Sequence, residues 1–144
     1  MLEGLPDHDT VFAQAIERHG VVLGFAVQGA STPGKEQAAA APAPYRYVWR
    51  GEPNLQSLHS FPGAVPSLPP LDAAARGNGA LTLVPDSDGV VRRVPLVLSV
   101  ANNPVPGFSA ELLRVAQGGS NYILKRADSA AVALEEVRIG ALSL

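Results

Sequence analysis

The first part of the chain shows two clear periods of apolar residues. Apolar positions recur at helical spacing across residues 10–20, and Gly20 supplies a stop signal for a helix. Asp7 or Asp9 is placed to cap that helix. The residues that share its apolar face are Val11, Ala15 and Ile16. The next run, VVLGFAV at residues 21–27, is apolar at nearly every position. Such a run is typical of a strand covered on both faces in a parallel or mixed sheet.

The segment that follows has a weaker pattern. Residues 29–44 are rich in alanine, proline and glycine, so we expect a mobile loop, with a short alanine-rich helix over residues 36–41 as the alternative. YRYVW at residues 45–49 alternates and predicts a short strand. Residues 61–71 contain four prolines and are expected to be extended and irregular.

The second half of the chain alternates between helical and strand patterns. PLDAAARGNG, from residue 70, predicts a short helix that ends at the glycines of residues 77–79. Two strands, at residues 80–84 and 91–100, are predicted on either side of the sequence PDSDG.

A helix and a strand are predicted to close the chain. GFSAELLRVAQG at residues 107–118 has helical spacing, and Ser109 is expected to cap it. The residues expected on its inward face are Phe108, Leu112 and Leu113. The tail, ALEEVRIGALSL at residues 133–144, has the pattern of one strand with polar flanks.

The order of these elements predicts an α/β fold. We expect a mixed β-sheet with helices packed on it and a central β-hairpin around residues 80–100. The 144 residues suit one domain with a substantial core. Because the chain opens on a helix and closes on an apolar strand, we expect residues 1–144 to be one domain truncated at both ends.

Composition narrows the possible functions. Hydrophobic residues make up 47% of the chain and charged residues 17%, which is typical of a globular protein. A net charge of −2 gives no support for a nucleic-acid surface. The absence of cysteine excludes disulfides, thiolate zinc sites and cysteine nucleophiles. No apolar run reaches the roughly 18 residues that a membrane span requires.

The most sharply patterned stretch is PDSDGVVRRVPL at residues 85–96. Asp88 and Gly89 form a strong turn signal, because glycine supplies the positive φ of a hairpin turn, and Asp86 can accept bonds from the turn amides. A calcium loop is the alternative, but it would need a glutamate about six residues beyond the glycine, where Pro95 stands. We therefore favour a hairpin corner.

The two arginines after this corner are predicted to point apart. Arg92 and Arg93 are adjacent in a strand, so their side chains face opposite sides and do not form one anion clamp. We expect one arginine to pair with a carboxylate and the other to be solvated. A buried structural ion pair is the special role that we favour for either.

Catalytic constellations are poor elsewhere in the sequence. The histidines, His8, His19 and His59, are far apart and lack metal-ligand spacing, so we expect surface roles and no metal or cofactor. The alternating aromatics Tyr45, Tyr47 and Trp49 favour a packed sheet face over a ligand platform. Residue chemistry alone therefore predicts a non-catalytic domain.

Four blocks of the chain resemble, in order and spacing, the type-two CHASE domain, a cyclase/histidine-kinase-associated extracellular sensory domain of bacteria. They read DHDTVFAQAIERHGVVLGF, LPPLDAAARGNGALTLVPDSDGVVRRVPLVLSV, PVPGFSAELLRVAQG and VRIGALSL. The most specific positions are Pro85, Asp86, Asp88, Gly89, Val90, Arg92, Arg93 and Pro95. The resemblance covers most of the chain except about residues 29–60. In this comparison the residues around the corner mark the family and hold a structural hairpin.

The resemblance implies a function and a location. It implies a non-catalytic extracytoplasmic sensor of a transmembrane receptor, periplasmic or extracellular in an inner-membrane protein. A cytoplasmic adenylate or guanylate cyclase or a histidine kinase would carry the output. It also implies a homodimer in the parent receptor and an unidentified small-molecule ligand, with the membrane reached only through flanking spans. The family supplies no ligand-binding residues, so the variable segment at residues 30–62 is our candidate for recognition, with a flexible insertion that binds no ligand as the alternative.

Two other functions remain open at this stage. One is a structural or dimerisation spacer without a ligand. The other is a small hydrolase, which would need a converging acid, base and nucleophile. A sensor is expected to contain a concave, partly polar pocket, whereas a spacer need not.

Overall fold

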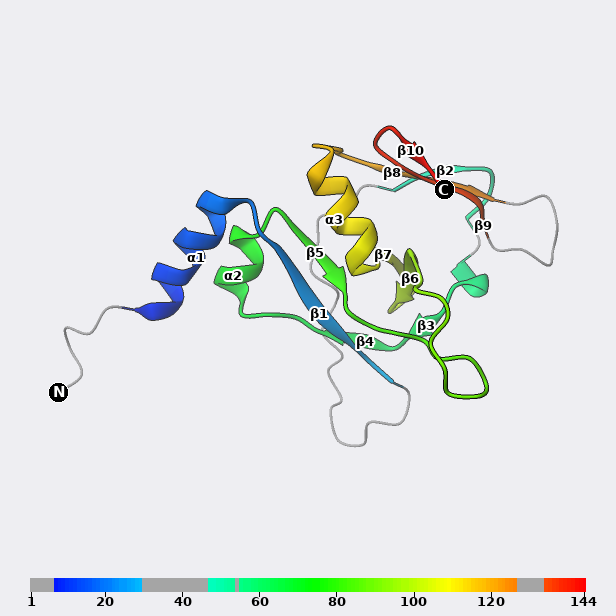
Figure 1. Ribbon diagram of the computed structural model, residues 1–144, viewed down its shortest axis with the longest axis horizontal. Helices are drawn as coiled ribbons and strands as arrows, with labels where there is room; N and C mark the ends of the chain where they lie inside the picture. Colours follow the sequence, from blue (N-terminus) through cyan, green and yellow to red (C-terminus); the bar gives the residue numbers. More distant parts are fainter. Residues whose placement is uncertain (1–6, 30–46, 54, 127–133) are drawn as a thin grey trace.

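The computed structural model describes residues 7–29, 47–53, 55–126 and 134–144, and Figure 1 shows how their elements are arranged. The helices are α1 (His8–His19), η1 (a 3₁₀ turn, Leu55–Ser57), α2 (Pro69–Ala74) and α3 (Phe108–Ala116). The strands are β1 (Val22–Gln28), β2 (Tyr47–Arg50), β3 (Ser60–Phe61), β4 (Gly63–Val65), β5 (Gly77–Ala80), β6 (Val97–Val100), β7 (Asn103–Pro106), β8 (Tyr122–Arg126), β9 (Leu134–Ile139) and β10 (Leu142–Ser143).

The strands of the described residues form three small mixed sheets, which confirms the predicted α/β class. Their strand orders are β4-β1-β5, β10-β9-β8-β2 and β3-β6-β7. The pairs β1–β5, β2–β8 and β3–β6 are parallel, and the other ladders are antiparallel. The sequence pattern predicted one mixed sheet, and its division into three follows from long-range pairings that local periodicity does not contain.

Helix α1 begins and ends where the sequence predicts. The carboxylate of Asp7 accepts a hydrogen bond of 3.1 Å from the amide of Asp9, and Gly20 ends the helix with φ +63°. Its predicted apolar face is covered only in part, because Ile16 is buried while Val11 is 53% exposed. The helix packs beside α2 at one end of the molecule (Figure 1). Strand β1 is likewise only partly covered, with Phe25 buried and Ala26 exposed.

The GNG sequence does not end a helix, contrary to the prediction. Helix α2 ends at Ala74, and residues 77–80 instead form β5, in which all four residues are buried. A Cβ atom on Gly79 would lie 2.6 Å from the Cα of Phe108 in α3. The glycines therefore allow a helix to approach the strand closely, a requirement that resembles a stop signal in sequence.

Helix α3 turns a different face inward from the one predicted. Its cap residue is Gly107, and no side chain bonds to the first turn, so Ser109 is not the cap. Leu112 and Leu113 are 44% and 37% exposed, whereas Ala110 and Glu111 are fully buried. Ala110 and Glu111 are the buried residues because the glycines of β5 let the helix backbone come close and leave space for one carboxylate.

Two apolar clusters make up the core of the described residues. The first joins β1, β4, β5, β6 and β7, and its buried members are Phe25, Ala64, Ala80, Leu98, Val100 and Val105. The second joins α3 to β6, β8 and β9, and its buried members are Val97, Ala110, Tyr122, Leu124, Val137 and Ile139. Strand β6 contributes to both clusters and so connects them.

The predicted hairpin is reduced to its turn. Strand β5 ends at Ala80 and β6 begins at Val97, and these two strands pair with other partners. Residues 81–96 therefore form an excursion, defined here as the corner loop, which extends from the body of the molecule beside β3 (Figure 1). The predicted strands are wrong over residues 81–96, whose backbones form no ladder beyond the turn itself, whereas residues 97–100 of the second predicted strand do form a strand, β6.

The tail also differs from the prediction. Residues 134–144 form the hairpin β9–β10, with the turn at Gly140, in place of one strand. The predicted strand at residues 45–49 is confirmed in its described part as β2. The predicted loop at residues 29–44 and its helical alternative lie outside the described residues, apart from Gly29.

We predict that Gly79→Ala destabilises the fold by about 1–3 kcal/mol, because the added methyl group overpacks the contact between β5 and α3. The free energy of unfolding from urea titration measures this. Gly29→Ala is the matched control, since a Cβ atom there meets nothing within 4 Å. Equal stability of the two variants would contradict the close approach.

Candidate functional site

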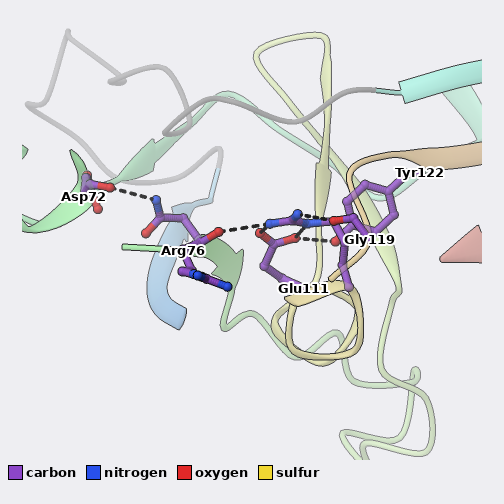
Figure 2. Close-up of polar contacts among 7 residues, drawn as sticks. Asp72, Arg76, Glu111, Gly119 and Tyr122 are labelled. Atoms are coloured by element: carbon purple, nitrogen blue, oxygen red, sulfur yellow. Dashed lines mark hydrogen bonds and ion pairs between the residues drawn. The ribbon is translucent and has the colours of Figure 1, made fainter. Parts of the chain in front are cut away.

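A buried polar cluster lies between α3 and β8. Glu111 has no exposed side-chain surface, and its carboxylate accepts hydrogen bonds of 2.6 and 2.9 Å from the guanidinium of Arg114. The hydroxyl of Tyr122 donates a further hydrogen bond to the same carboxylate. Figure 2 shows Glu111 and Tyr122 facing each other. We call these three residues the carboxylate cluster.

Arg114 extends this cluster to the backbone on both sides. Its guanidinium donates to the carbonyl of Gly119 at 2.7 Å and to the carbonyl of Arg76 at 3.1 Å. Arg76 directly precedes β5, and Gly119 lies between α3 and β8 (Figure 2). One arginine therefore connects α3 to the entry of β5 and to the loop that leads into β8.

The local sequence explains how a carboxylate fits in the interior. Glu111 and Arg114 are three residues apart in α3, so they lie on one face of the helix. A Cβ atom on Gly77 would lie 2.1 Å from a carboxylate oxygen of Glu111, so glycine is needed there. Tyr122 is also stacked on Tyr47 of β2, with ring centroids 5.2 Å apart.

The electrostatics of the carboxylate cluster are those of a structural ion pair. Burial raises the pKa of Tyr122, and the hydrogen bond to Glu111 raises it further. The hydrogen bonds that Arg114 donates to Glu111 raise the pKa of Arg114. Both oxygens of the carboxylate are occupied by donors, and no solvent reaches it. The cluster therefore stabilises the joint between α3, β5 and β8 and offers no free group for chemistry.

Sequence reasoning missed this cluster. It interpreted the helix by its leucines and gave Glu111 no role. The available signal was an acid and a base three residues apart within an otherwise apolar helix, following a glycine strand. That signal is weak, because most such pairs are solvated.

The corner loop holds the second polar group of interest. The guanidinium of Arg92 binds Asp86 at 3.0 Å and Asp88 at 2.8 Å. The hydrogen bond from Arg92 lowers the pKa of Asp88. One arginine therefore pairs with a carboxylate, as predicted. The side chain of Arg92 is 53% exposed, however, so the prediction that this ion pair is buried is wrong. The oxygens that a calcium ion would require face a cation instead.

The turn within the corner loop has the geometry that the Asp-Gly pair predicts. The amide of Gly89 donates to the carbonyl of Asp86 at 2.9 Å, and the amide of Asp86 donates to the carbonyl of Val90 at 3.0 Å. Gly89 has φ +80°, and the carboxylate of Asp88 accepts a bond from the amide of Val90. This is a turn followed by a glycine bulge.

Arg93 takes no part in this ion pair and lines a cleft. The cleft has a volume of about 570 Å³. Its described lining residues are His59, Val84, Pro85, Asp86, Arg93, Val94, Pro95 and Leu134. Among the described residues, Arg93 has no ion-pair partner. Arg92 thus pairs with carboxylates while Arg93 lines the cleft, although both lie in a loop and not in the predicted strand. Four of the eight family-marking residues line this cleft: Pro85, Asp86, Arg93 and Pro95.

Other sequence candidates lie apart from this cleft. His8 and His19 are exposed at the two ends of α1, and no group of acids and histidines in the described residues is arranged to hold a metal. Tyr47 and Trp49 pack against the second core cluster, as the sheet-face interpretation predicts, while Tyr45 lies outside the described residues. A smaller cleft of about 290 Å³ lies beside Gly118 and Arg138.

The fold and its polar groups define a small α/β module whose described acids are mostly paired with arginines or lysines. The sequence matches the CHASE2 domain family over residues 2–142, so the chain belongs to that family of extracellular sensory domains in signalling receptors. No curated protein and no solved structure matches the chain. Among the described residues, no helix has the length and apolar character needed to cross a bilayer.

We predict that Tyr122→Phe changes how stability depends on pH. The folded state keeps the phenol protonated above the unfolded pKa of about 10, so the stability it contributes is complete below pH 10 and is lost as the pH rises further. The wild-type chain should lose about 1.4 kcal/mol more per pH unit than the variant above that pH. Urea titrations at several alkaline pH values measure this. Parallel curves for both proteins would contradict the assigned environment.

We predict that Gly89→Val lowers the free energy of unfolding by about 1–3 kcal/mol, because a branched residue is strained at positive φ. A Cβ atom there meets nothing within 4 Å, so the cost is conformational rather than steric. Gly89→Asn is the matched control, since asparagine tolerates this conformation. Equal urea midpoints for the two variants would show that the turn is not formed.

Proposed function

We propose that this chain is the extracytoplasmic sensory domain of a bacterial transmembrane receptor in the inner membrane. In this proposal it relays a stimulus to a cytoplasmic adenylate or guanylate cyclase or histidine kinase. The observation that carries the proposal is the family match over residues 2–142. The match itself supplies a sensory, extracellular and non-catalytic domain, and the receptor type and output are our extension of it.

The relay requires two states with different affinity for the stimulus. We propose that the domain works as a homodimer in which the stimulus favours one arrangement, and that membrane spans of the parent receptor pass this bias inward. Exposed apolar side chains support an interface between copies. On α1, the neighbouring residues Val11 and Phe12 are 53% and 54% exposed, and contiguous exposed apolar surface is typical of interfaces.

The cleft favours a sensor over a spacer. A spacer needs no concave surface, whereas the cleft beside Arg93 combines an apolar wall with charged groups. A hydrolase receives less support. The larger cleft has no serine, threonine or cysteine among its described lining residues, and in the smaller one Ser120 has no described acid or histidine beside it.

We predict that Ser87→Cys in the full-length receptor reacts with a membrane-impermeant maleimide in intact cells. Ser87 lies at the exposed tip of the corner loop, and these 144 residues contain no cysteine, so within this domain the label reports a single position. The unsubstituted receptor gives the background. A cysteine placed in the cytoplasmic output domain is the matched control and should react only after lysis. Labelling of Ser87→Cys only after lysis would overturn the extracytoplasmic placement.

A further inference from the structure

The cleft beside Arg93 has three kinds of wall. Apolar side chains come from both arms of the corner loop, at Val84, Pro85, Val94 and Pro95. Leu134, at the start of β9, supplies a further apolar surface. Charged and polar groups come from Asp86, Arg93 and His59. Its volume of about 570 Å³ lies within the roughly 300–1,000 Å³ that is usual for small-molecule sites.

The charges around this cleft favour an anion. Asp86 is the acid on the wall, and its carboxylate is engaged by Arg92 at 3.0 Å. Arg93 is the full positive charge on the wall and has no ion-pair partner among the described residues. A guanidinium has a planar fork of donors that matches a carboxylate. His59 adds a ring N–H donor, which imidazole has in both protonation states.

The walls are fixed to the body of the fold. The carbonyl of His59 accepts a hydrogen bond of 2.9 Å from the amide of Ser99, directly before the β3–β6 ladder. The carbonyl of Leu96 accepts one of 2.8 Å from Gly107, where a Cβ atom would lie 2.2 Å from the carbonyl oxygen of Pro95. Leu134 packs against the second core cluster. The cleft is thus supported at three points, which favours binding because little order must be imposed on it.

Other features are weaker candidates for a ligand site. The smaller cleft is only about 290 Å³, and its Arg138 lies 3.8 Å from the carboxylate of Glu136. The carboxylate cluster is sealed and fully bonded. Of these three polar sites in the described residues, the cleft beside Arg93 therefore combines the most space with a charge that has no ion-pair partner there.

We propose that this cleft binds a small organic carboxylate with an apolar body. Arg93 holds the carboxylate, His59 donates a second hydrogen bond, and the prolines, valines and Leu134 cover the apolar part. The claim that this carboxylate is the sensory ligand rests on the function proposed above. The claim that the cleft binds it rests on the residues of the cleft alone.

The test is a titration of the isotope-labelled 144-residue chain with hexanoate, followed by backbone amide resonances. We expect saturable shifts at Val84, Asp86, Arg93 and Val94, the lining residues of the corner loop that carry a backbone amide hydrogen. Acetate, which lacks the apolar body, should bind more weakly, and hexylammonium, which reverses the charge, should not bind. Absence of saturable shifts with hexanoate, or equal binding of hexylammonium, would overturn the proposal.

Variants localise the site. Arg93→Gln should weaken hexanoate binding by about tenfold or more, because it removes a charge-assisted pair of hydrogen bonds. Arg18→Gln is the matched control, since it removes the same charge from exposed α1 at the far end of the molecule (Figure 1). Val94→Asn should reduce the preference for hexanoate over acetate. Equal loss in Arg18→Gln, or none in Arg93→Gln, would place the binding elsewhere and refute the site.

The outcome separates this inference from the sensory proposal. Labelling of Ser87→Cys in intact cells without hexanoate binding would leave an extracytoplasmic domain and refute the cleft as a carboxylate site. Hexanoate binding that depends on Arg93, together with labelling only after lysis, would support the site and refute the extracytoplasmic sensor.

Discussion

The buried carboxylate of Glu111 constrains the rest of this fold. A charge without exposure must have its lone pairs satisfied, because an unpaired buried carboxylate costs several kcal/mol. Arg114 and Tyr122 meet that requirement, and each fixes a neighbour. Arg114 binds the backbone before β5 and before β8, and Tyr122 belongs to β8. The hydrogen bonds that satisfy this one side chain thus hold α3 to the sheet that contains β5 and to the sheet that contains β8.

The sequence predicts those elements whose signals are local and fails where a residue serves a long-range contact. Elements whose signals are local, such as the Asp7 cap and Gly20 stop of α1 and the Asp88–Gly89 turn, lie where the residues indicate. GNG was misinterpreted because its glycines serve a tertiary contact with α3. The inward face of α3 was misassigned because apolarity was taken as burial, while the space beside a glycine strand admits Ala110 and Glu111 but no leucine.

The candidate site shows the same division. The sequence predicts that one of two adjacent arginines pairs with a carboxylate, and Arg92 does so from a loop instead of the predicted strand. The cleft depends on His59 and Leu134, which are far from Arg93 in sequence and reach it through the β3–β6 ladder and the start of β9. No sequence spacing predicts that His59, Leu134 and Arg93 lie around one cleft. The sequence therefore predicts the arginines and the Asp88–Gly89 turn, whereas the cleft depends on how the strands are connected in the fold.

The position of the cleft bears on how occupancy would reach the remainder of the domain. One wall continues through Pro95 and Leu96 to Gly107, the cap residue of α3. Another lining residue, Leu134, packs on the second core cluster, which also contains Tyr122. Under the proposed function, a ligand that drew these two parts of the lining together would therefore act both on the start of α3 and on the cluster that contains Tyr122. A buried ion pair resists gradual deformation, because its hydrogen bonds are either made or lost. Under the proposed function, this favours movement of α3 with its strands as a unit over local softening.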